Sequence, residues 1–307
     1  MPFYFNFANV PVTIPVFFAI RDQISDKYNV EFIFVDDGSR DGTYSALEAV
    51  QAQNPDFVTT VKLSRNFGST NAVFAGIEYS KGDVHIFTAS DLQTPPSMIL
   101  EMLDYWEKGI KVVYAHRTGR DESFFVRVTA RIYHWLISIA LPGSPKGGFD
   151  SFLLDRKVTE DVSRNRSANE YLPSLIMWLG YPSVGIPYVR LKRTIGKSRW
   201  NFSKKMGAFF DSFLGYSYLP IRAIAIVGVI FGILGIAYLL LIIVSYINGD
   251  IDERGWASLM SVVLIAASVN FIFLSILGEY VWRILTSVQA RANFIVETSS
   301  RRVSSNG

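Results

Sequence analysis

The chain has 307 residues, no cysteine, 50% hydrophobic residues and a mean hydropathy of +0.23. This apolar content excludes a disordered chain, and the absence of cysteine excludes a disulfide framework. A positive mean hydropathy combined with 19% charged residues predicts a soluble part joined to a membrane part. The net charge of +3 is too small to indicate a nucleic-acid-binding protein.

The first eighteen residues lack a basic region and contain prolines, so they match a signal peptide poorly. From Glu31 onward, runs typical of strands alternate with runs typical of helices. The predicted strands are Glu31–Asp37, Val58–Ser64, Val84–Ser90 and Lys111–Arg117, and the predicted helices are Thr43–Gln53, Ser69–Ser80 and a segment that Pro95 and Pro96 open and Lys108 ends. This order predicts a largely parallel sheet covered on both faces, with ligands bound at the carboxyl ends of its strands.

Two polar turns follow predicted strands. Asp36 and Asp37 end the first strand, where a carboxylate accepts hydrogen bonds from a sugar hydroxyl or a base N–H; the alternative is an ordinary turn and helix cap. Asp91 and Gln93 offer hard oxygen ligands that suit Mg²⁺ or Mn²⁺ carrying phosphates; the alternative is a strand-end cap. The scattered histidines do not predict a zinc site, and no hydrolase, P-loop or dinucleotide motif occurs.

The segment Arg190–Lys205 contains seven basic residues and no acidic residue. Arginine forks and lysines in such a segment bind a diphosphate or a lipid phosphate. The alternative is a patch beside the membrane that is attracted to anionic lipids, and the two interpretations are compatible.

Two uncharged runs, Ala223–Ile247 and Trp256–Gly278, are each about 35 Å long as helices and predict two transmembrane spans. The alternative is a pair of buried core helices, which seldom stay apolar on all sides. The linker Asn248–Gly255 is acidic, whereas basic residues flank the outer ends of both spans, so both termini are expected in the cytoplasm. The Ser- and Arg-rich tail from Asn293 is expected to be disordered.

The predicted organisation has four parts. A cytoplasmic domain covers residues 1–203, and an amphipathic helix in the membrane interface covers 204–219, because aromatic and small residues alternate there. Residues 220–284 form the two-helix transmembrane domain and 285–307 the cytoplasmic tail.

Six segments in a fixed order resemble the family-2 glycosyltransferases that move a sugar from a nucleotide sugar to polyprenyl phosphate, a group that includes dolichol-phosphate mannose synthases and the bactoprenol glucosyltransferases of O-antigen modification. The segments are FVDDGSRDGT, VKLSRNFGS, DLQTPP, GGFDSFLLDR, WLGYP and RTIGKSRW. The resemblance runs from about Pro2 to Arg283 and implies an α/β nucleotide-diphospho-sugar transferase domain of the GT-A, Rossmann-like type, an interfacial helix and two transmembrane helices. Any one motif is weak, but the ordered set is specific.

The resemblance also implies roles for individual residues. The residues implied for the nucleotide sugar are Pro2, Tyr4, Asn6, Asp36, Asp37, Arg65 and Asn66, and those implied for donor or acceptor phosphate are Arg117, Arg131, Arg193, Lys197 and Ser198. Asp91 and Gln93 would hold Mg²⁺ or Mn²⁺ on the diphosphate, and Asp150 would lie near the reacting groups, so Asp91 and Asp150 are the implied catalytic residues.

The chain departs from the family pattern in three places. Ala89 stands where relatives usually have the first Asp of a DxDLQ run, and Phe7 replaces the Glu that contacts the nucleobase. The chain also starts at Met1, near the end of the first strand of relatives, so a central strand is expected to be nearly absent. Either the start is late or the domain is damaged at this edge.

The sequence therefore predicts an inverting, metal-dependent transferase at the cytoplasmic face of the inner membrane, as an integral multi-pass protein. Its partners would be a nucleotide sugar of the UDP-glucose or GDP-mannose type, polyprenyl phosphate and membrane lipids, with a homo-oligomer left open and no nucleic acid. Two alternatives stay open: a non-catalytic membrane protein on a degenerate transferase scaffold, and a polysaccharide synthase. The synthases usually carry QxxRW and more spans, whereas Gly196-Lys197-Ser198 precedes the RW dipeptide here.

Overall fold

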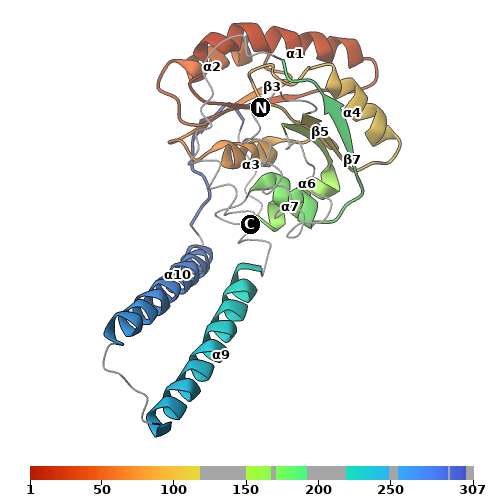
Figure 1. Cartoon of the computed structure of the whole chain (residues 1–307). Helices are drawn as coiled ribbons and strands as arrows, with labels where there is room; N and C mark the ends of the chain where they lie inside the picture. Colours follow the sequence, from red (N-terminus) through yellow and green to blue (C-terminus); the bar gives the residue numbers. More distant parts are fainter. Residues whose placement is uncertain (118–149, 167–170, 192–218, 249–254, 290, 302–307) are drawn as a thin grey trace. The chain divides into compact units, whose positions relative to one another are not determined.

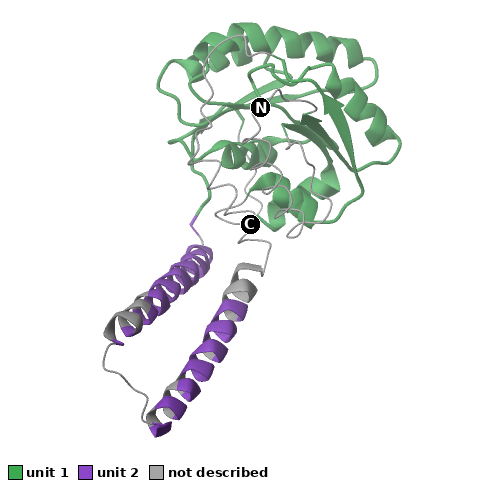
Figure 2. Ribbon diagram, in the orientation of Figure 1, with its two compact units in different colours: residues 1–212, 292–307 green, residues 213–291 purple. Residues whose placement is uncertain are grey.

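The computed structural model describes residues 1–117, 150–166, 171–191, 219–248, 255–289 and 291–301 (Figure 1). The chain divides into two compact units (Figure 2). Unit 1 comprises Met1–Ser212 together with Ala292–Gly307, and unit 2 comprises Phe213–Arg291. The C-terminal residues therefore belong to the same unit as the N-terminal ones.

Unit 1 is an α/β domain. Its described strands are β1 (Pro2–Phe3), β2 (Phe32–Asp36), β3 (Val58–Leu63), β4 (Val84–Phe87), β5 (Val112–Arg117), β6 (Ser151–Asp155), β7 (Ser183–Tyr188) and β8 (Val296–Ser299). Its described helices are the short 3-10 helix η1 (Phe7–Asn9), α1 (Val10–Ile24), α2 (Thr43–Gln53), α3 (Ser69–Tyr79), α4 (Met98–Glu107), α6 (Arg156–Arg164) and α7 (Leu172–Trp178). The strands and helices expected between Glu31 and Arg117 are thus confirmed, most of them a residue or a few shorter than predicted.

The described strands form two four-stranded sheets, in the orders β1-β2-β3-β8 and β4-β6-β5-β7. The pairs β1/β2, β2/β3 and β5/β7 are parallel, whereas β3/β8, β4/β6 and β5/β6 are antiparallel. The expectation of one largely parallel sheet is therefore only partly right. The two-residue β1 confirms that the first strand is nearly absent, and among the described strands β4 pairs with β6 alone.

Helices cover both faces of the strands, as the alternation of side chains requires. Phe34 packs with α1 and α2, whereas its neighbour Val35 packs with α3 on the other face. Likewise Leu153 contacts α4 residues, and Leu154 lies in the cluster formed by α3, α6 and α7. In Figure 1, α1 accordingly lies above the strands and α3, α6 and α7 below them.

Two details correct the sequence analysis. The tail from Asn293 is not disordered throughout: Val296–Ser299 form β8, because Val296 pairs with Leu63 and Phe294 is buried in the core. The helix after the two prolines begins at Met98 rather than at the prolines, whose carbonyls instead accept turn hydrogen bonds from the N–H groups of Met98 and Ile99.

Unit 2 contains two long helices, α9 (Leu219–Asn248) and α10 (Trp256–Val288). Within the described residues, Ile265–Val288 is long and apolar enough to cross a membrane, and Ile226–Tyr238 is a shorter apolar stretch. Large apolar side chains such as Ile233 and Phe271 are exposed along both helices. The predicted interfacial helix at 204–219 lies almost entirely outside the described residues.

Candidate functional site

Charged and polar side chains meet at one edge of the β4-β6-β5-β7 sheet. Arg117 and Tyr188 are the last residues of the parallel strands β5 and β7. Asp150 directly precedes β6, which runs antiparallel to β5, so it reaches the same edge. The turn after β4 carries Asp91 and Gln93. This is the edge where the sequence predicted the site.

Asp150 is the centre of the first cluster. Arg117 donates two hydrogen bonds to its carboxylate, from Nε and Nη2, and the Tyr188 hydroxyl donates a third. Burial alone would raise the pKa of Asp150, but the hydrogen bonds from Arg117 and Tyr188 outweigh burial and lower it. Burial and the hydrogen bond to Asp150 raise the pKa of Tyr188 to about 12. Asp150 is therefore ionised near neutral pH, and its charge fixes the Arg117 fork.

Asp91 and Gln93 lie on one tight turn. The Gln93 N–H donates to Asp91 Oδ1 at 3.2 Å, and Leu92 between them has a φ of 53°, in the left-handed region. The turn is joined to the first cluster, because the Thr94 hydroxyl donates to the Tyr188 oxygen at 3.4 Å. The left-handed residue thus shapes a turn in which the Gln93 backbone N–H is bonded to the Asp91 carboxylate.

The segment after β7 docks on Gln93. Arg190 Nη2 donates to the side-chain oxygen Oε1 of Gln93. The Leu191 N–H donates to the Gln93 carbonyl at 3.0 Å, and Gln93 Nε2 donates to the Leu191 carbonyl at 3.4 Å. Arg190 is therefore part of the site, at the start of the basic segment that the sequence singled out.

Asp36 and Asp37 end β2 in different environments. Asp36 is fully buried and accepts from the Ser39 N–H at 3.1 Å, and its Oδ1 has no hydrogen-bond partner among the described residues. Burial raises the pKa of Asp36. Asp37 accepts from the N–H groups of Phe67 and Gly68, at 2.7 and 3.0 Å. Its carboxylate thus fixes the turn before α3 from within the protein.

The other residues implied for the nucleotide lie around this turn. Gly38 has a φ of +71°, and a Cβ there would lie 2.3 Å from the Arg65 carbonyl carbon, so only glycine fits. Arg65 and Asn66 are exposed, and the Arg65 guanidinium lies over the Phe67 ring, 4.4 Å from its centroid.

The N-terminal residues link the two sheets at this edge. Asn6 donates from Nδ2 to the Ser90 hydroxyl at 2.6 Å and from its backbone N–H to the Thr43 hydroxyl at 2.9 Å. Pro2 lies in β1 opposite Val35, and the Tyr4 ring packs edge-on against Phe5. Asn6 therefore bridges the start of α2 and the turn after β4.

Four predicted phosphate-binding residues, Arg131, Arg193, Lys197 and Ser198, lie outside the described residues. The sequence analysis missed Tyr188 and did not single out Arg190 within the basic segment. Tyr188 ends the strand Ser183–Tyr188, which was not predicted. The sequence signal for Tyr188 was weak: a mostly apolar run ends in this tyrosine, two residues before Arg190, the first basic residue of the segment.

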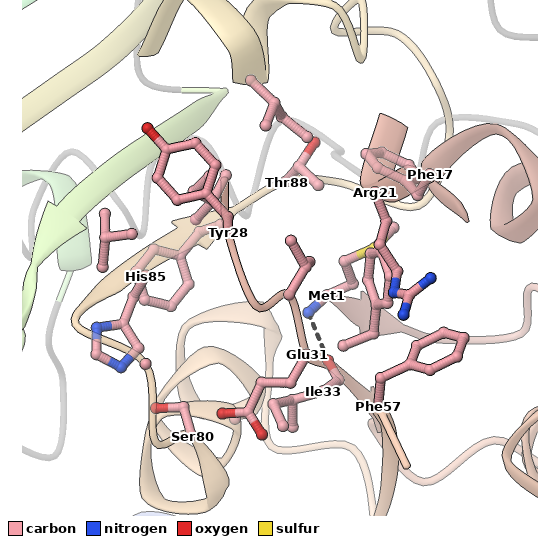
Figure 3. A pocket seen from close by; sticks show the side chains of 18 of the residues that line it. Met1, Phe17, Arg21, Tyr28, Glu31, Ile33, Phe57, Ser80, His85 and Thr88 are labelled. Atoms are coloured by element: carbon pink, nitrogen blue, oxygen red, sulfur yellow. Dashed lines mark hydrogen bonds between the residues drawn. The ribbon is translucent and has the colours of Figure 1, made fainter. Parts of the chain in front are cut away.

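A cavity of about 640 Å³ lies away from this cluster, between β2 and β4. Figure 3 shows Met1, Tyr28, Glu31 and His85 around it, with the Met1 amino group donating to the Ile33 carbonyl at 2.8 Å. None of the predicted site residues that the structure describes lines the cavity. The cavity is therefore not the site that the sequence predicts.

The donor set of the Asp91 turn fits a hard divalent cation. One carboxylate and one amide oxygen are ligands that Mg²⁺ and Mn²⁺ accept, with phosphate oxygens and water completing the shell. Among the described residues no group of three or more His, Asp or Glu side chains is placed to hold a metal by itself. The residues present therefore suit a metal that arrives with a phosphate ligand.

Oxygen donors and guanidinium groups at the carboxyl edge of an α/β sheet define a domain suited to phosphate-bearing ligands. Residues 1–161 match the family described as glycosyl transferase family 2, so the chain belongs to that family. The protein is a glycosyltransferase. This assignment decides against the non-catalytic alternative, and it does not choose between a polyprenyl-phosphate transferase and a polysaccharide synthase.

Relatives match almost the whole chain. It is 34% identical over 275 residues to the glycosyltransferase sll0501 of Synechocystis, covering 88% of this chain and 85% of the relative. It is 30% identical over 297 residues to the bactoprenol glucosyl transferase of Shigella phage SfII, covering 95% and 96%. Among solved structures, mannosyl-3-phosphoglycerate synthase from Rubrobacter xylanophilus is 15% identical, with a TM-score of 0.45, covering 73% of this chain and 71% of the synthase.

Proposed function

We propose that this glycosyltransferase moves a sugar from a nucleotide sugar to a polyprenyl phosphate at the cytoplasmic face of the inner membrane. The observation that carries the proposal is its 30% identity over 95% of its length to a bactoprenol glucosyl transferase. The polar cluster at the edge of an α/β domain supports the donor half of the proposal, and the apolar helices α9 and α10 support a membrane-bound acceptor. The soluble unit is proposed to be of the GT-A type.

The chemistry asked of the protein is mainly positioning and charge neutralisation. A phosphate monoester is already ionised near pH 7, so its oxygen attacks the anomeric carbon with little need for a base. Asp91 and Gln93 would hold Mg²⁺ or Mn²⁺, which supplies positive charge to the departing nucleoside diphosphate. Direct displacement inverts the configuration at the anomeric carbon.

Arg117 is the described residue best placed to bind a phosphate. Asp150 and Tyr188 hold its guanidinium in one orientation, so that it meets an incoming phosphate already positioned. Asp36 would accept a hydrogen bond from the nucleoside only if its buried Oδ1, which lacks a partner among the described residues, became accessible when the donor binds. Arg131, Arg193, Lys197 and Ser198 complete the proposed phosphate-binding set.

Two transmembrane spans are proposed rather than one. Because β8 pairs with β3, the chain leaves unit 1 before α9 and returns to it after α10. A chain that returns to the same folded unit crosses a membrane an even number of times. If the segment Ile265–Val288 in α10 crosses, α9 must cross as well. Its 30 residues give about 45 Å of helix, which is enough.

The test is to incubate membranes containing the protein with radiolabelled UDP and GDP sugars in turn, and to extract the lipid. We expect the label from one donor in the polyprenyl-phosphate fraction. The variant Asp91→Asn, or excess EDTA, should remove nearly all of this label, whereas the exposed control Asp104→Asn should not. Label only in a water-soluble product or a polymer would refute the acceptor, and full activity in EDTA would refute the metal.

A further inference from the structure

Arg190 is hydrogen-bonded to the side-chain oxygen of Gln93, which the proposed function assigns as a metal ligand. Its Nη2 donates to Gln93 Oε1, and two further hydrogen bonds between Gln93 and Leu191 keep the segment in place. A guanidinium and a divalent cation are both drawn to that oxygen, and their like charges repel at such short range. They therefore cannot both occupy it closely.

The charges around Arg190 support such a competition. Partial burial and the positive charge of Arg117 lower the pKa of Arg190, and the carboxylates of Asp150 and Asp91 oppose this lowering. The guanidinium thus lies within the field of both carboxylates. Among the described residues of this cluster, two carboxylates and two guanidiniums cancel in formal charge. Without Arg190 these residues would carry a net negative charge that attracts a cation.

We propose, on the basis of the proposed function, that Arg190 takes the place of the divalent cation in the donor-free site and moves onto the diphosphate when the metal and nucleotide bind together. Arg190 is an exposed residue, so its side chain can turn without disturbing the core. A diphosphate offers it a bidentate partner in exchange for one amide oxygen.

This exchange has a thermodynamic consequence. The cation alone must displace Arg190 and leave it unpaired, whereas the cation with a nucleotide gives Arg190 a new partner. The nucleotide and the metal therefore bind cooperatively, and by linkage each raises the affinity of the other by the same factor. Arg190 is a positioning and coupling residue rather than a group that forms or breaks a bond.

The experiment measures Mn²⁺ binding to the full chain in detergent, from the electron paramagnetic resonance signal of the free ion. Without nucleotide, Arg190→Gln should bind Mn²⁺ roughly ten- to a hundredfold more tightly than wild type, as loss of one positive charge nearby predicts. Addition of UDP or GDP, tested in turn, should tighten Mn²⁺ binding strongly in wild type and much less in Arg190→Gln. The exposed control Arg164→Gln should behave as wild type.

A double-mutant cycle with Gln93→Ala locates the effect. If Arg190 acts through the Gln93 oxygen, the gain from Arg190→Gln should largely vanish in the Gln93→Ala background. The inference would be overturned if Arg190→Gln raised Mn²⁺ affinity equally in the Gln93→Ala background, or did not raise it in the single variant. Either result would leave a metal role for Asp91 intact. If no form of the protein binds Mn²⁺ in an Asp91-dependent way, the metal part of the proposed function fails and the inference falls with it.

Discussion

Leu92 determines the shape of the turn that carries Asp91 and Gln93. Its φ of 53° lies in the left-handed region, which costs a non-glycine residue about 1 kcal/mol or more. The hydrogen bond from the Gln93 N–H to Asp91 Oδ1 offsets part of this cost. The strain is located at the two side chains that the proposed function assigns to the metal.

Leu92→Val and Leu92→Asn should separate backbone strain from side-chain contacts. A β-branched residue tolerates the left-handed region worst, so Leu92→Val should lower sugar transfer severalfold and destabilise the domain by about 1 kcal/mol. Asparagine adopts this region readily, so Leu92→Asn should stay close to wild type in both respects. Lipid-linked label and thermal unfolding of the purified protein measure the two effects. Equal losses in both variants would show that the Leu side chain, not the backbone, matters.

Replacing Asp150 should lower the stability of the domain. Its side chain is 18% exposed and that of Arg117 is 25% exposed, so Asp150→Asn leaves a mostly buried guanidinium without its carboxylate. Removing one partner of such a pair should cost about 3 kcal/mol of stability. Thermal unfolding of wild type and variant at pH 7 measures it.

The difference in stability between wild type and Asp150→Asn should decrease as the pH falls. Burial tends to raise the folded-state pKa of Asp150. The hydrogen bonds from Arg117 and Tyr188 outweigh burial and lower this pKa below its ordinary value of 3.8. Its stabilisation is therefore complete above that value and is lost as pH falls below it. The gap in unfolding temperature between wild type and Asp150→Asn should shrink from pH 7 to pH 2.5. A constant gap would mean that the variant acts through packing alone.

The sequence predicted most of this cluster because its members occupy the ends of recognisable strands. Asp91 and Gln93 follow a predicted strand and Arg117 ends one, whereas Asp150 was named because it lies in a motif that carries the family resemblance. Tyr188 was missed because Ser183–Tyr188 contains a glycine and a proline, which weaken a strand pattern. The pairing of Arg190 with Gln93 joins residues 97 apart, and no local pattern encodes it.

Among the elements, β8 shows how tertiary contacts override composition. Its surroundings are Ser- and Arg-rich, which favours disorder. However, Val296 and Phe294 supply apolar anchors, and Arg301 pairs with Glu31 at 2.8 Å while the Ser300 N–H donates to the Thr60 carbonyl at 3.0 Å. The sequence reveals the helices better, because Thr43–Gln53 and Ser69–Tyr79 are bounded by clear turn residues, whereas an edge strand depends on a partner far away in the chain.

Phe294→Ala and Ile295→Ala test whether β8 is an integral part of unit 1. Phe294 is 9% exposed, and truncating a buried phenylalanine costs about 3 kcal/mol or more. Its neighbour Ile295 is 58% exposed, so Ile295→Ala should change little. Thermal unfolding of the domain in detergent, followed by circular dichroism, gives the comparison. Matching unfolding temperatures for wild type and Phe294→Ala would mean that the tail is not held on the domain in solution.

At the scale of the whole molecule, β8 links the fold of unit 1 to membrane topology. Strand β8 pairs with β3, so unit 1 contains residues from before and from after the segment Phe213–Arg291. This arrangement requires an even number of crossings and is independent of the charge distribution. The distribution agrees with it, because the linker between the helices carries Asp250, Asp252 and Glu253.

The absence of native cysteine makes this topology directly measurable. A cysteine introduced by Asp252→Cys, between α9 and α10, should react with a membrane-impermeant maleimide added to intact cells whose outer membrane has been permeabilised. A cysteine introduced by Ser97→Cys, at an exposed position of unit 1, should react only after lysis. Because unit 1 contains both chain ends around the two helices, the opposite labelling of these positions follows from two crossings. Labelling of both positions only after lysis would mean that neither helix crosses, whereas labelling of Ser97→Cys alone in intact cells would invert the orientation and place the transferase outside the cytoplasm.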